Sequence, residues 1–259
     1  MTAIFLRVTV CGSSCSIPRP GRACSSYLIE GNGTAFVADL GSGALANVLR
    51  SRSAESLDAV VISHMHADHF LDIVPLRYAL KYGPRTNDRK VALYLPPDGE
   101  VMLRRLVAAF DGDAGIDFLG DVYDVRTYDP AAALQIGAAA LHFAPTQHFI
   151  PTFAIRAQIG AAAVTYSSDT APSDSVVTLA RGSQAFLCEA TLGIGEEDLE
   201  PRGHSSAREA AGMAARADAA RLVLTHYAAT ATPAEIARSA ASAYGGPIDV
   251  ADDGDVVLL

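Results

Sequence analysis

Short apolar runs bounded by turn-forming residues recur along the chain and predict a protein rich in β-strands. The runs consist mainly of Val, Ile, Leu, Ala and Phe and end near Gly, Pro, Asp or Ser, a pattern typical of buried strands. They predict strands at Ile4–Val10, Ser26–Ile29, Ala35–Ala38, Ala59–Ser63, Val91–Leu95, Ala140–Phe143, Ala154–Gln158, Ala163–Ser167, Ala185–Cys188 and Leu222–Thr225.

Helical patterns lie between several of these runs. Pro75 suits the first turn of a helix that Gly83-Pro84 would end. Apolar residues at positions 103, 106, 107 and 110 form a helical stripe along Glu100–Phe110. Two capping boxes predict the starts of C-terminal helices, at Ser206-Ala207-Arg208-Glu209 and at Thr232-Pro233-Ala234-Glu235.

The order of these elements predicts an α/β fold with sheets at the centre and helices outside. Strands come first in hairpin-like clusters and later alternate with helices, which is typical of a layered arrangement. No Gly- or Ser-rich linker divides the chain, so we expect a single domain over residues 1–259. Arg85–Arg89 and Phe110–Asp124 have the composition of loops.

The composition is that of an ordinary globular protein. Half of the residues are apolar and 19% are charged. No apolar run approaches the roughly 20 residues of a membrane-spanning helix. Met1–Val10 has one basic residue and an alternating pattern, which predicts a first strand rather than a signal peptide. We therefore expect no membrane partner and a cytoplasmic location.

Net charge and cysteine usage narrow the class further. The formal charge of −9 argues against a large surface for long nucleic acids, because phosphate contacts need clustered Lys and Arg. Cys11, Cys15, Cys24 and Cys188 form no CxxC pair, which argues against a zinc ribbon. We interpret them as small buried side chains with reduced thiols.

The segment with the clearest chemistry is His64-Met65-His66-Ala67-Asp68-His69. It holds three of the seven histidines and directly follows the apolar run Leu57–Ser63. Imidazole and carboxylate are the ligands that a cation such as Zn²⁺ accepts. An ordinary solvated turn would explain one or two histidines, but not this density at the end of a buried strand. The segment therefore predicts a metal site.

Three later residues share the same context. Each is a polar residue placed just after an apolar run, where the end of a buried strand would deliver it to the edge of a sheet. On its own, each would more often be structural. These residues are His148, Asp169 and His226.

The order of these motifs resembles the metallo-β-lactamase superfamily through nearly the whole chain. The resemblance implies an αββα sandwich with metals at one edge between the sheets. It further implies that His64, His66 and His148 hold a first metal, that Asp68, His69 and His226 hold a second, and that Asp169 bridges both. Asp39 matches an early aspartate of the superfamily that would steady the His64 loop.

Three further features resemble the ribonuclease Z and phosphodiesterase branch. Gly12-Ser13-Ser14, followed by Pro18 and Ser25-Ser26, is similar to that branch's N-terminal loop. Cys188-Glu189-Ala190-Thr191 resembles its Glu-Ala-Thr motif, and Gly203-His204-Ser205-Ser206 resembles the segment of its extra catalytic histidine. The resemblance implies that His204 gives a proton to the departing ester oxygen, and we expect Glu189 to orient it.

One departure from that branch bears on the substrate. Ribonuclease Z carries a long tRNA-gripping arm between the residues that match His148 and Asp169, and here they are 21 positions apart. That spacing leaves no room for an arm and argues against tRNA processing. A smaller departure is Ser167-Ser168, where Ser-Gly is usual, and we expect the backbone to tolerate serine.

These features predict a binuclear hydrolase of a small phosphodiester, with 3′,5′-cyclic nucleotides as the first candidate. Two divalent ions, zinc or alternatively manganese or iron, would activate a water that Asp68 or Asp169 positions. One alternative is a tRNA 3′ endonuclease. Another is a lactonase or thioesterase, and an enzyme of that kind would not need His204. A di-iron redox protein is disfavoured by His66, and a metal-free scaffold by the complete ligand set. Relatives of this type are often dimers, so a homodimer stays open.

Overall fold

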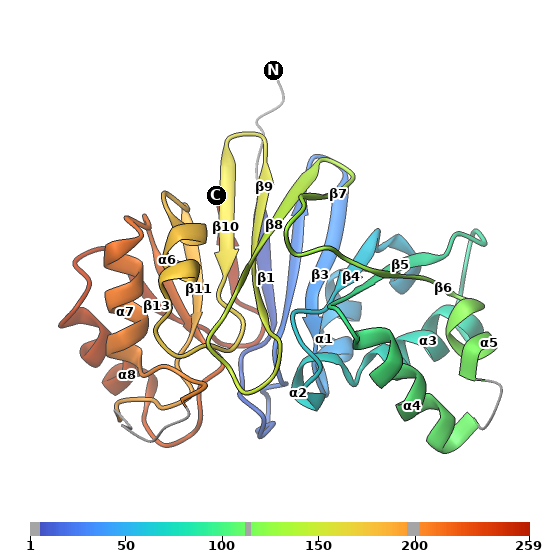
Figure 1. The fold of residues 1–259 in the computed structure, drawn as a ribbon, viewed down its shortest axis with the longest axis horizontal. Coiled ribbons are helices and arrows are strands. Elements are labelled where there is room, and N and C mark those ends of the chain that lie inside the picture. The colour runs from blue at the N-terminus through green and yellow to red at the C-terminus, as the bar shows by residue number, and fades with distance from the viewer. Residues whose placement is uncertain (1–5, 112–114, 196–201) are drawn as a thin grey trace.

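The protein is built from two central β-sheets whose outer faces are covered by helices. The structure, a computed structural model, describes residues 6–111, 115–195 and 202–259. The sheets stand face to face, one helical group lies beyond each, and four layers result (Figure 1). This arrangement confirms the expected αββα sandwich.

The first sheet has the strand order β14-β1-β2-β3-β4-β5-β6. Pairing is antiparallel from β14 through β3 and parallel from β3 through β6. Its strands are β1 (Arg7–Gly12), β2 (Ser26–Gly31), β3 (Thr34–Leu40), β4 (Ala59–Val61), β5 (Val91–Leu95), β6 (Tyr123–Thr127) and β14 (Val256–Leu258).

The second sheet repeats this pattern with the order β7-β8-β9-β10-β11-β12-β13. Pairing is antiparallel from β7 through β10 and parallel from β10 through β13. Ligand sites in α/β sheets lie beyond the carboxyl ends of parallel strands, so both sheets offer such an edge. The strands are β7 (Leu134–Ile136), β8 (Ala139–Pro145), β9 (Phe153–Ile159), β10 (Ala162–Tyr166), β11 (Ala185–Glu189), β12 (Leu222–Thr225) and β13 (Ile248–Val250).

The helices fall into two groups, one outside each sheet (Figure 1). Both expected capping boxes are present, with Ser206 and Thr232 accepting from the backbone N–H of Glu209 and Glu235. The first group contains α1 (Ala44–Ser51), η1 (Ala54–Ser56), α2 (Ala67–Phe70), α3 (Ile73–Tyr82), α4 (Gly99–Asp111) and α5 (Gly115–Gly120); the second contains α6 (Asp174–Ala180), α7 (Ala207–Arg216) and α8 (Pro233–Ala241).

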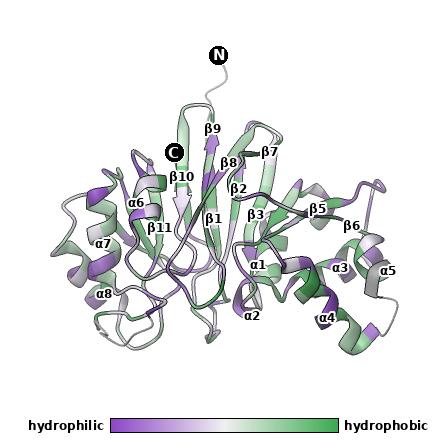
Figure 2. Ribbon diagram, viewed as in Figure 1, coloured by the Kyte–Doolittle hydropathy of each residue, from purple (hydrophilic) through white to green (hydrophobic). Residues whose placement is uncertain are grey.

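Three hydrophobic clusters hold the four layers together. One lies between the sheets and includes Tyr27 and Tyr166, whose ring centroids are 4.6 Å apart. The other two join each sheet to its helices, for example through Leu76 in the first group and Met213 in the second. Hydrophobic residues accordingly concentrate on the strands, and the helices show hydrophilic and hydrophobic residues in alternation (Figure 2). Burial of this apolar surface is the main force that stabilises the sandwich.

Most expected elements are confirmed with shifts of a few residues at their ends. The expectation of a loop over Phe110–Asp124 is wrong, because α4 continues to Asp111, α5 follows, and β6 begins at Tyr123. β6 is an edge strand with a half-exposed polar sequence, so it lacks the apolar run that marks a central strand. Ile4 and Phe5 of the first expected strand lie outside the described residues.

The four cysteines are buried and free, as expected. Burial raises the pKa of the Cys11 and Cys24 thiols to about 12, so both are inert at neutral pH. Within the three described stretches, no helix combines the length and apolar composition needed to cross a lipid bilayer.

Replacement of two glycines by alanine should have opposite effects on stability. A Cβ at Gly41 would lie 1.9 Å from the carbonyl oxygen of Asp68 and 2.8 Å from Cβ of Cys24. We expect Gly41→Ala to lower the free energy of unfolding by at least about 1–3 kcal/mol. A Cβ at Gly212, inside α7, meets nothing within 4 Å, so Gly212→Ala should raise it by about 0.5–1 kcal/mol. Urea denaturation measures both; equal midpoints for Gly41→Ala and the wild type would contradict the packing argument.

Candidate functional site

All the expected metal ligands gather where strands from both sheets end. β4 leads to His64 and His66 on a loop, and α2 then carries Asp68 and His69. The remaining residues follow three strands of the second sheet. These are His148 after β8, Asp169 after β10 and His226 after β12.

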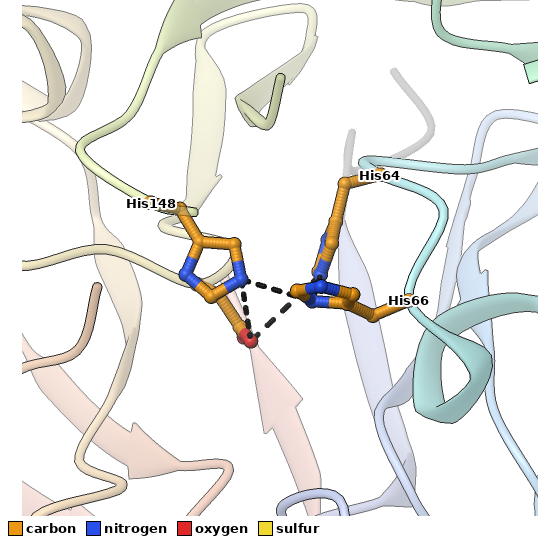
Figure 3. A group of neighbouring side chains, drawn as sticks. His64, His66 and His148 are labelled. Carbon is orange, nitrogen blue, oxygen red and sulfur yellow. Dashed lines mark hydrogen bonds and ion pairs between the residues drawn. The ribbon is translucent and has the colours of Figure 1, made fainter. Parts of the chain in front are cut away.

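The first group of donor atoms contains three imidazoles and a carboxylate. Nδ1 of His66 lies 3.1 Å from Nε2 of His64 and 3.0 Å from Nε2 of His148. The three rings approach from two separate loops (Figure 3). Oδ2 of Asp169 completes the group, 3.8 Å from Nε2 of His64 and 3.7 Å from Nε2 of His148. All four donor atoms lie within 4.8 Å of one another, as a shared cation requires.

The second group lies on the other side of Asp169. Nε2 of His69 and Nε2 of His226 are 3.3 Å apart, and Oδ2 of Asp68 lies 3.5 and 3.3 Å from them. Oδ1 of Asp169 is 3.3 Å from Nε2 of His69 and 3.4 Å from Nε2 of His226. Ligands about 2.0–2.2 Å from a tetrahedral zinc ion are separated by roughly 3.3–3.6 Å. The group therefore has the spacing of a tetrahedral metal site.

Asp169 joins the two groups, with one carboxylate oxygen facing each. Its side chain is only 3% exposed. Oδ1 is buried and has no hydrogen-bond partner among the described residues. A buried carboxylate oxygen without a donor is costly unless it faces a cation. The donor chemistry and this orphaned atom both fit divalent metal binding.

Asp39, at the end of β3, fixes the loop that carries the first histidines. Its Oδ2 accepts hydrogen bonds from Nδ1 of His69 (2.7 Å), Oγ of Ser63 (2.8 Å) and the hydroxyl of Tyr166 (2.9 Å). Its Oδ1 accepts from the backbone N–H of Ser63 at 2.7 Å. These contacts agree with the expected steadying role.

Other histidines are oriented in the same way by groups that the sequence did not identify. Nδ1 of His148 donates to the carbonyl oxygen of Gly203 at 2.7 Å, and Nδ1 of His226 lies 2.8 Å from Oγ1 of Thr191. Such partners hold Nδ1 and turn Nε2 toward a metal. Thr191 belongs to the motif Cys188-Glu189-Ala190-Thr191, but the motif does not reveal that its partner is His226. A backbone carbonyl such as that of Gly203 leaves no trace in the residue type.

The electrostatics of the centre favour neutral imidazoles on one side and added positive charge on the other. Burial holds the pKa of His64 well below its ordinary value. Burial also disfavours the charged form of His69, but Asp169 and Asp39 outweigh it and raise the pKa of His69 well above its ordinary value. Despite burial, His226 and His69 hold the pKa of Asp169 well below its usual range. Two carboxylates thus favour positive charge at His69, which a proton or a metal cation can supply.

His204 and Glu189 form a pair beside these groups. Nδ1 of His204 lies 2.9 Å from Oε1 of Glu189 and 3.9 Å from Oδ2 of Asp169. Glu189 is fully buried and also accepts from the backbone N–H groups of Thr170 and Thr191. Burial lowers the pKa of His204, but the hydrogen bond and charge of Glu189 outweigh this and raise the pKa above its ordinary value. The 23% exposure of the His204 side chain leaves it open to a ligand.

Three residues at the site have left-handed backbone conformations. The φ angles are +57° at Asp39, +53° at Ser168 and +48° at His226. Ser168 stands where glycine is usual in the resembling family, and its hydroxyl donates to Oγ of Ser63 at 2.7 Å. That hydrogen bond gives a reason for serine at a position where glycine is less strained.

A family model for the β-lactamase superfamily domain matches residues 21–227, a span that includes every proposed ligand. The chain belongs to the metallo-β-lactamase superfamily.

Similar proteins cover this superfamily member almost from end to end. An uncharacterized protein of Mycobacterium leprae is 32% identical over 256 residues, which are 98% of this chain and 89% of that protein. The probable metallo-hydrolase YhfI of Bacillus subtilis is 28% identical over 97% of this chain and 99% of its own. Its crystal structure superposes with a TM-score of 0.88 at 25% identity, over 98% and 100% of the two chains. Ribonuclease Z of Natronomonas pharaonis is 27% identical over 97% of each chain. These similarities place the protein in the ribonuclease Z-like branch of the superfamily, and it is a metal-dependent hydrolase.

Metal content tests the donor groups one at a time. We expect His148→Ala and His226→Ala each to lower the metal bound per chain, and Asp169→Asn to lower it most because Asp169 faces both groups. His142→Ala is the matched control, since this exposed histidine of β8 lies outside both groups. Elemental analysis of the folded, desalted proteins gives the content. Wild-type content in Asp169→Asn, or an equal loss in His142→Ala, would contradict the assignment.

Proposed function

We propose that this protein is a two-metal phosphodiesterase that hydrolyses a small phosphodiester, with 3′,5′-cyclic nucleotides as the first candidate substrate. The observation that carries the proposal is the His204–Glu189 pair beside the donor groups. A hydrolase of thioesters needs the metals but no proton donor for the leaving group, because a thiolate leaves without a proton. A poor alkoxide leaving group does need one.

The ligand assignment follows the two donor groups. One ion would be held by His64, His66 and His148, the other by Asp68, His69 and His226, and Asp169 would contact both. Histidine-rich donor sets suit zinc, with manganese and iron as alternatives. When bound, the two ions would supply Lewis acidity and a nucleophile at neutral pH.

Asp68 is the carboxylate best placed to orient the attacking water. Its side chain is 12% exposed, whereas that of Asp169 is 3% exposed. A water molecule can therefore approach Asp68 from solvent and donate a hydrogen bond to it. We assign Asp68 the role of orienting the attacking water and accepting its proton.

His204 would act on the leaving group. Because Nδ1 is bound to Glu189, Nε2 is the atom left to give its proton to the departing oxygen as the phosphorus–oxygen bond breaks. Glu189 would hold the ring in the tautomer and orientation this needs. The raised pKa of His204 favours the protonated form of the ring, as a proton donor requires.

The size of the site segments supports a small substrate. Between His148 and Asp169 the chain forms only the hairpin β9–β10, which turns at Gly160. A tRNA 3′ endonuclease remains the second candidate function, since a ribonuclease Z is 27% identical to this chain.

Four free thiols support a reducing compartment and hence a cytoplasmic location.

The substrate class is tested directly by incubating the zinc- or manganese-loaded protein with 3′,5′-cyclic AMP. We expect AMP to form and chelation of the metal to abolish its formation. Chromatography of the products gives the result. If metal-loaded protein forms no AMP but processes tRNA precursors or opens lactones, the corresponding alternative replaces the phosphodiesterase assignment.

The leaving group tests the role of His204. We expect His204→Ala to lower kcat for 3′,5′-cyclic AMP by about 10²–10⁴-fold, the usual contribution of general acid catalysis. With bis(p-nitrophenyl) phosphate the loss should be below about 10-fold, because nitrophenolate leaves without a proton. Steady-state kinetics with both substrates and an unchanged metal content are the measurements. Equal losses on both substrates would mean that His204 does not protonate the leaving group.

A further inference from the structure

Phe149 is an exposed aromatic side chain at the rim of the site. It follows His148 directly in the loop after β8, and 55% of its surface is exposed. Its ring centroid lies 5.1 Å from that of His148 and 5.9 Å from that of His204. Phe149 therefore lies beside both a proposed metal ligand, which points into the site (Figure 3), and the proposed proton donor.

The ring is held in place on one side by the backbone of Gly203. A Cβ at Gly203 would lie 2.4 Å from Cε2 of Phe149 and 2.7 Å from Cδ2 and Cζ. Any larger residue at position 203 would displace the ring from this place. The carbonyl oxygen of the same Gly203 accepts the hydrogen bond from His148. Phe149 is thus packed on one side while more than half of its surface stays open to solvent.

Other exposed aromatic residues in the described chain lie elsewhere and contact one another. Tyr78 and Tyr82 of α3 stack at 6.1 Å, and Phe110 of α4 contacts Phe118, as does Tyr78. Phe149 instead contacts histidines of the site. An exposed ring fixed next to the reacting groups matches a ligand contact better than a packing contact.

From this placement we propose that Phe149 is a specificity residue that stacks on the nucleobase of the substrate. The substrate class is then a nucleotide phosphodiester rather than a base-free one. This proposal rests on the proposed phosphodiesterase function. In a nucleotide, one sugar separates the base from the phosphate. In the site, the imidazole of His148 similarly separates Phe149 from the proposed metal-binding groups, so a base could reach Phe149 while the phosphate lies at the metals. Stacking on an aromatic ring tolerates any base, because every base has a π-face.

Binding of AMP and ribose 5-phosphate to the metal-loaded protein isolates the contribution of the base. We expect AMP to bind about 5-fold to 100-fold more tightly than ribose 5-phosphate, which is the usual range for one stacked base. Phe149→Leu should remove most of this difference by weakening AMP binding alone. Phe149→Tyr should keep it. Isothermal titration calorimetry gives the dissociation constants, and the metal content of each variant is measured alongside.

Tyr82→Leu is the matched control, because Tyr82 is 73% exposed on α3, away from the site; its affinity ratio should equal that of the wild type. If Phe149→Leu leaves the AMP to ribose 5-phosphate ratio unchanged, the proposal is overturned.

Turnover separates failure of this proposal from failure of the proposed function. We expect Phe149→Leu to raise KM for 3′,5′-cyclic AMP by about 5-fold to 100-fold with a much smaller effect on kcat, as for loss of uniform binding. Activity on glycerophosphoethanolamine but on no nucleotide would overturn the role of Phe149 and leave a phosphodiesterase. Inactivity on both, with an affinity ratio that still depends on Phe149, would overturn the phosphodiesterase and leave the nucleobase contact.

Discussion

The rest of the site depends on one buried carboxylate, Asp169, at the junction of the two sheets. Removing such a charge from water costs several kcal/mol unless positive charge faces it. Its two oxygens face histidines that come from both sheets: His64 and His148 on one side, His69 and His226 on the other. These contacts can form only when both sheets are assembled and face to face. The donor set therefore forms together with the packing of the two sheets. Cation binding would stabilise the fold as well as complete the site for catalysis.

Local strain at this junction is offset by hydrogen bonds. A non-glycine residue in the left-handed region costs about 1–3 kcal/mol, and Asp39 and His226 are both in that region. Asp39 accepts four hydrogen bonds, including those from Ser63 and His69. Bonds to a charged group contribute about 1.5–3 kcal/mol each, so four of them offset strain of this size. The strained turns are thus stable because the side chains that they direct into the site form hydrogen bonds.

Sequence alone predicted the parts of this protein that recur as dense local patterns. Buried strands such as β5, the capping boxes and the segment from His64 to His69 are visible because their signal lies within a few residues. Edge elements such as β6 were missed, since a half-exposed strand has a polar sequence. Partners that approach through space could not be found. Thr191 bonds His226 across 35 positions, and Gly203 bonds His148 across 55. Neither pairing leaves a periodic trace in the chain.

The segment Gly203-His204 shows how closely chemistry and selectivity are linked at the rim. The carbonyl of Gly203 orients His148, its missing Cβ makes room for Phe149, and the next residue is the proposed proton donor. A shift of this backbone would move a metal-binding group, an aromatic contact and a proton donor together. Selectivity could therefore change most easily at Phe149, whose side chain is exposed and whose loss leaves these backbone contacts intact. On the proposed roles, buried contacts fix the chemistry of this site, and its exposed edge sets the choice of substrate.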